Sequence, residues 1–192
     1  MKWLAALLFF LSSTHAFAQA MQVDPKTLQQ APETRWFNLD RTSTGYIAAG
    51  NLGGTLWAFH VRGYEMKKLA PTTFSLDGVV LQVRAIPKKA LKLSGPTDVL
   101  GAHKAYEQKH LAATTANVAF RSHEFCRSAS VPYQQWIAQV PNGITQAFVT
   151  FLVGDFILMV MAPYENAKRE ELAGRAISEV CTTFQEPKPV KP

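Results

Sequence analysis

Residues 144–153, ITQAFVTFLV, followed by Gly154-Asp155 and then by residues 156–162, FILMVMA, decide the fold of this chain. Two apolar segments joined by a two-residue turn predict neighbouring antiparallel strands, because glycine adopts the backbone conformations that such turns require. Both faces of each strand are apolar, since Phe148 points away from Phe151 on the first strand and Met159 points away from Leu158 on the second. We therefore expect helices on both sides of the sheet, or a helix on one side and a docked partner on the other.

The segments before this hairpin extend it into a meander. Residues 118–126 and 133–140 read as two further strands, and the turn Pro141-Asn142-Gly143 connects the second of them to residue 144. Nearer the N-terminus, residues 55–62 alternate between apolar and polar side chains, as a half-buried strand does. Other strands are expected at 46–49 and 79–85, with residues 50–54 as a glycine-rich turn.

Two helices complete the expected domain. Residues 98–113 place apolar side chains at helical spacing after the N-cap candidates Thr97 and Asp98. Residues 166–184 form an amphipathic helix whose apolar stripe includes Ile177, Cys181 and Phe184. The predicted fold class is α+β: an antiparallel sheet of about six or seven strands flanked by helices, with the C-terminal helix packed on the sheet, as one domain over residues 36–184.

The ends of the chain predict export and a tail. Residues 1–20 combine Lys2, a short apolar run and small residues at the exit, which are the parts of a secretory signal peptide cleaved after Ala18 or Ala20. The protein is thus expected in the periplasm or outside the cell, and no later apolar run is long enough for a membrane helix. Residues 21–35 are a lead-in segment, and residues 185–192, rich in Pro and Lys, are a flexible tail.

Charge and cysteine content narrow the possible partners. The chain carries 20 Lys and Arg against 14 Asp and Glu, but its basic residues are scattered rather than clustered with aromatic side chains, so no nucleic-acid partner is expected. Cys126 and Cys181 are the only cysteines, and a single pair in an exported chain predicts a disulfide between them.

The order of these elements, with a helix at 97–113, consecutive strands and a terminal helix after an apolar strand, resembles the PsbP-like family over about residues 36–184. That resemblance implies an antiparallel sheet flanked by helices. It also implies a protein that binds other proteins, as most members of the family do, rather than an enzyme. No binding residue of the family maps onto this chain.

Few residues are spaced for chemistry. His103, Glu107 and His110 share one helix face, but the first and last imidazoles are about 10.5 Å apart along the axis, too far for one metal ion. His123 and Glu124 are adjacent in an expected strand, so they would point to opposite faces. The glycines of residues 50–54 lack the lysine of a phosphate loop, and no nucleophile motif is present. We predict no catalytic, metal or cofactor site.

The leading functional prediction is a non-enzymatic envelope protein that binds another protein, such as an immunity protein, an inhibitor or an accessory factor. The alternative is a small periplasmic hydrolase or metal-dependent enzyme that uses His103, Glu107, His110 or His123. A third interpretation is a carrier that holds an apolar ligand between sheet and helix.

Overall fold

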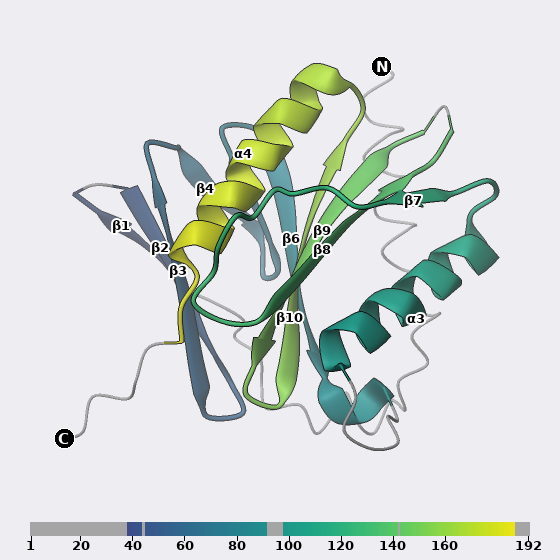
Figure 1. Cartoon of the computed structure of the whole chain (residues 1–192). Coiled ribbons are helices and arrows are strands. Elements are labelled where there is room, and N and C mark those ends of the chain that lie inside the picture. The colour runs from purple at the N-terminus through teal and green to yellow at the C-terminus, as the bar shows by residue number, and fades with distance from the viewer. Residues whose placement is uncertain (1–37, 44, 92–97, 142, 187–192) are drawn as a thin grey trace. The chain divides into compact units, whose positions relative to one another are not determined.

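The computed structural model describes residues 38–43, 45–91, 98–141 and 143–186 (Figure 1). The expected signal peptide, the lead-in segment 21–35 and residues 187–192 of the tail lie outside these ranges. Among the described residues, no helix has both the length and the apolar character needed to cross a membrane.

The larger sheet has seven antiparallel strands in the order β4-β5-β6-β10-β9-β8-β7. Its central pair is the hairpin predicted from the sequence, with the turn at Gly154-Asp155 and Gly154 at a φ of 50°. The strands are β4 (Met66–Ala70), β5 (Thr73–Leu76), β6 (Val79–Pro87), β7 (Ala119–Arg121), β8 (Tyr133–Gln139), β9 (Thr145–Val153) and β10 (Phe156–Tyr164). The predicted α+β class is confirmed.

A second sheet was not expected from the sequence. It contains β1 (Asn38–Thr42), β2 (Gly45–Leu52) and β3 (Thr55–Arg62), all antiparallel. The predicted glycine turn is narrower than residues 50–54, because β2 continues to Leu52 and only Gly53 and Gly54 have positive φ angles. The short strands β4 and β5 were also missed.

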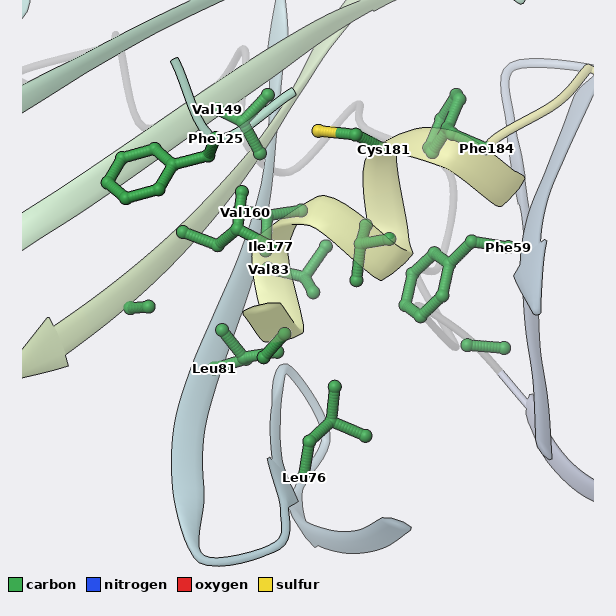
Figure 2. Close-up of a cluster of buried hydrophobic side chains, with 14 of the residues drawn as sticks. Phe59, Leu76, Leu81, Val83, Phe125, Val149, Val160, Ile177, Cys181 and Phe184 are labelled. Atoms are coloured by element: carbon green, nitrogen blue, oxygen red, sulfur yellow. The ribbon is translucent and has the colours of Figure 1, made fainter. Parts of the chain in front are cut away.

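Helix α4 (Ala167–Thr183) packs between the two sheets, in contact with β3, β6, β9 and β10. Asn166 caps it by accepting a hydrogen bond from the Arg169 N–H. Its fully buried Ile177 and Cys181 lie among apolar side chains of both sheets, including Phe59 and Val160 (Figure 2). This core joins the two sheets through the helix.

Helix α3 (Val99–Thr114) contacts β8, β9 and the 3-10 turn η1 (Lys88–Leu91). Asp98 is its N-cap, and its side chain accepts from the Gly101 N–H. The helix lies on the face opposite α4, because it meets Trp136 while the next residue along β8, Ile137, belongs to the α4 core. Of the two alternatives expected for the apolar faces, the structure has the first, a helix on each side of the sheet.

Two predicted boundaries were wrong. The strand expected over 118–126 is only β7, because the backbone N–H groups of Phe125 and Cys126 donate to the Gln135 side chain instead of to a strand. The tail was expected from residue 185, yet Gln185 exchanges two backbone hydrogen bonds with Ala58, and Glu186 Oε1 accepts from the Gly154 N–H. Residues 185 and 186 are therefore bonded to the folded domain.

Candidate functional site

Residues 122–132, which connect β7 to β8, form what we call the stapled loop. Figure 1 shows this segment running from β7 across α4 and returning to β8. Cys126 of the loop forms a disulfide with Cys181 of α4, with Cα atoms 5.6 Å apart, within the usual range for such bonds. Ser130 Oγ also donates to the carbonyl oxygen of Phe184 at 2.5 Å. Both ends of the crossing are thus tied to the terminal helix region.

Gln135 of β8 holds the loop from the sheet side. Its Oε1 accepts from the N–H groups of Phe125 and Cys126, each at 2.9 Å, and its Nε2 donates to the Cys126 carbonyl at 3.2 Å. The Tyr133 hydroxyl donates to the same carbonyl at 3.2 Å. One side chain therefore satisfies three backbone groups that a strand partner would otherwise satisfy. The loop is irregular in shape but held at every one of these points.

A groove of about 570 Å³ lies between the stapled loop and α4. We call it the loop groove. Phe125, which is buried, packs against Gly174 of α4, where an added Cβ would stand only 3.3 Å from the Phe125 ring. Glycine at 174 thus allows the loop to approach the helix closely. The His123 ring lies over Phe125, with centroids 4.4 Å apart.

Charged side chains of both signs line the loop groove. On α4, Glu170 pairs with Arg121 at 2.8 Å and Glu171 pairs with Arg175 at 2.9 Å. The ionisable lining of the groove consists of His123, Glu124, Arg127, Glu170, Glu171 and Arg175. The first three belong to the loop and are exposed. The groove therefore combines a buried aromatic side chain with exposed polar groups that can form directional contacts.

A smaller cavity of about 460 Å³ lies where the β2–β3 and β9–β10 turns approach η1. Lys88 Nζ lies 3.9 Å from the carboxylate of Asp155 in the β9–β10 turn. The backbone N–H of Lys88 donates to the Asp155 carbonyl oxygen. The cavity is built from turns whose polar groups already bond one another.

The structure separates the residues that the sequence grouped on α3. His103 and Glu107 are buried and their Nε2 and Oε1 atoms are 3.4 Å apart, whereas His110 is half-buried near the end of the helix. Among the described residues, no group of three or more His, Cys, Asp and Glu side chains is placed to hold a metal ion. His103 and Glu107 are therefore enclosed under the helix, away from any substrate in this conformation.

The other histidines also lie in settings that the sequence did not predict. His123 and Glu124 were expected on opposite faces of a strand, but both are in the exposed loop and both line the loop groove. His60 is half-buried, and its Nδ1 accepts from Arg62 Nε at 3.2 Å. The cysteine pair predicted one contact between residue 126 and α4, but the loop groove was missed because the other contacts between residues 122–132 and α4 have no local signature in the sequence.

Comparison of the chain with models of known protein families and with curated proteins finds no match.

Proposed function

We propose that this protein is exported, is not an enzyme, and binds another protein of the cell envelope through the loop groove. The observation that carries the proposal is the stapled loop, which presents His123, Glu124 and Arg127 beside α4 while its backbone is held by a disulfide and by Gln135. A preorganised loop loses little conformational entropy on binding, which favours affinity.

Export is supported by the signal-like residues 1–20 and by the Cys126–Cys181 bond, since disulfides form and persist mainly in oxidising compartments. The resemblance to the PsbP-like family, whose members mostly bind proteins, supports the same function. Inhibitor-type and immunity-type activities are the specific forms that a rigid recognition loop fits best.

The alternative of a small hydrolase or metal-dependent enzyme receives less support. Two of its four candidate residues, His103 and Glu107, have almost no exposed surface. A catalytic group must come within hydrogen-bond reach of its substrate, and these two cannot do so without movement of α3.

A photo-reactive cross-linker tests the proposal in the full exported protein. Placed at Arg127, it should capture one envelope protein, whereas the same group at Lys67, exposed on β4, should not. The captured protein is then purified and its Kd is measured. Arg127→Glu should weaken binding by about tenfold or more, and Lys67→Glu should leave it unchanged. Equal capture from both positions, or a Kd unaffected by Arg127→Glu, would remove the loop groove as the site.

A further inference from the structure

Helix α3 is attached to the sheet by a stripe in which half of the residues are ionisable. Its four buried residues are Leu100, His103, Glu107 and Leu111. The contact between His103 Nε2 and Glu107 Oε1 joins two residues of the same helix, so it does not tie the helix to the sheet. A buried pair of this kind loses its hydration when the helix docks, and the mutual attraction often fails to compensate.

The sheet residues packed against this stripe are mostly apolar. The rings of Trp136 on β8 and Phe148 on β9 stack with their centroids 5.0 Å apart. The His103 ring meets the Trp136 ring edge-on, with a centroid distance of 6.2 Å. His103 Nδ1 and Trp136 Nε1 are both buried and have no hydrogen-bond partner among the described residues. Each gives up hydrogen bonds to water on docking and gains none in exchange.

One charge of the sheet faces the stripe. Arg84 of β6 is largely buried, which lowers its pKa, while the negative charge of Glu107 acts in the opposite direction and raises it. Arg84 and Glu107 therefore attract each other across the interface between helix and sheet. Both groups lose part of their hydration when they are buried together, which opposes that attraction.

The other helix is attached quite differently. Five buried residues of α4, from Ala173 to Cys181, are all apolar, one of them is cross-linked to the stapled loop, and Thr183 bonds to the backbone of His60. Because apolar burial and cross-links favour the docked state, we expect α4 to be more firmly held than α3.

We infer that α3 is a displaceable cover. It leaves the sheet as a unit, in a local opening that keeps α4 and both sheets folded, and the buried pair of His103 and Glu107 is the main cause. Opening returns the His103 ring and the Trp136 N–H to water. It also uncovers the stacked rings of Trp136 on β8 and Phe148 on β9. This face is opposite α4, so the inference is independent of the loop groove.

Hydrogen exchange of the full mature protein tests the inference, and the molecule supplies its own control. Trp136 and Trp57 are both fully buried, the first under α3 and the second in the core with α4. We expect the Trp136 indole N–H and the α3 amides to exchange at least about tenfold faster than the Trp57 indole N–H and the α4 amides. Equal rates would mean that α3 opens only with the whole domain, and the inference would be wrong.

A variant identifies the cause of the opening. The double variant His103→Leu/Glu107→Met replaces both members of the buried pair with apolar side chains of similar size, so it should slow exchange at Trp136 by about tenfold. His110→Leu, a half-buried histidine of the same helix, is the matched control and should change the rate little. Faster exchange at Trp136 in the double variant would show that the His103–Glu107 pair holds the helix down, contrary to the inference.

Discussion

The hydroxyl of Thr183, near the end of α4, bonds both backbone groups of His60 on β3. It accepts from the His60 N–H at 3.0 Å and lies 2.6 Å from the His60 carbonyl oxygen. On either side, Ala58 pairs with Gln185 and the Arg62 N–H donates to Glu179 Oε1 at 3.1 Å. The terminal helix and the residues after it thus cover the β3 edge of the smaller sheet, which would otherwise be open to pairing with another chain.

Replacing Thr183 tests this edge. Thr183→Val keeps the shape of the side chain but leaves the His60 backbone groups without their partner, so it should lower the free energy of unfolding by about 1–3 kcal/mol. Thr182→Val is the control, because Thr182 is exposed and its hydroxyl bonds only to Ser178 within the helix. Denaturant melts measure both variants. Equal losses would mean that the bonds to His60 contribute nothing of their own.

The disulfide should be present in the mature protein and important for its stability. Mass analysis without reductant should find the chain two hydrogens lighter than its reduced form. Replacing Cys126 and Cys181 with Ser should cost about 4 kcal/mol of unfolding free energy, given their separation of 55 residues. Two thiols that react with an alkylating reagent in the native protein would contradict the pairing.

Gln135→Leu should release the stapled loop. The substitution removes the acceptor of two backbone N–H groups, which should cost about 1–3 kcal/mol and raise the mobility of the loop. Trypsin cleavage after Arg127 reports that mobility directly, because Arg127 is exposed within the loop. Gln139→Leu, at the exposed end of β8, should leave cleavage unchanged. A loop that resists trypsin equally in both variants would show that the disulfide alone holds it.

The α4 core should be sensitive to loss of volume. Ile177 is fully buried between the sheets, so Ile177→Ala should cost about 2–4 kcal/mol in a denaturant melt. Truncation after Glu186 removes a Pro- and Lys-rich segment with no apolar periodicity and should cost almost nothing. If the truncation destabilised the protein as much as Ile177→Ala, the core would extend past Glu186.

Tyr164 should make stability fall at high pH. Burial, followed by the charge of Glu170, raises its pKa above 10.0, although the hydrogen bond from Arg121 opposes the shift. The folded state therefore favours the neutral phenol, so this contribution is complete below about pH 10 and is lost as the pH rises through the raised pKa. Denaturant melts at pH 9 and pH 11 should show a smaller alkaline loss in Tyr164→Phe than in the unmodified protein.

Local patterns were sufficient to predict much of the fold. The Gly154-Asp155 hairpin, the alternating strand β3 and the N-cap at Asp98 depend on neighbouring residues only, and the structure contains them all. The cysteine pair could also be predicted, because a chain with two cysteines offers a single connectivity. The turn, strand and cap are determined by residues close together in the sequence, and two cysteines can form only one intramolecular pair.

Tertiary structure alone decided the rest. The attachment of the smaller sheet to α4 includes bonds between His60 and Thr183, which are 123 residues apart. The end of β7 is set by the N–H groups of Phe125 and Cys126, which donate to the Gln135 side chain. Threonine and glutamine occur throughout the sequence, and nothing next to Thr183 or Gln135 indicates that these two side chains bind distant backbone groups. The burial of His103 and the approach of the stapled loop to Gly174 are likewise set by packing between distant segments, because contact free energies depend on what meets each side chain, and not on its neighbours along the chain.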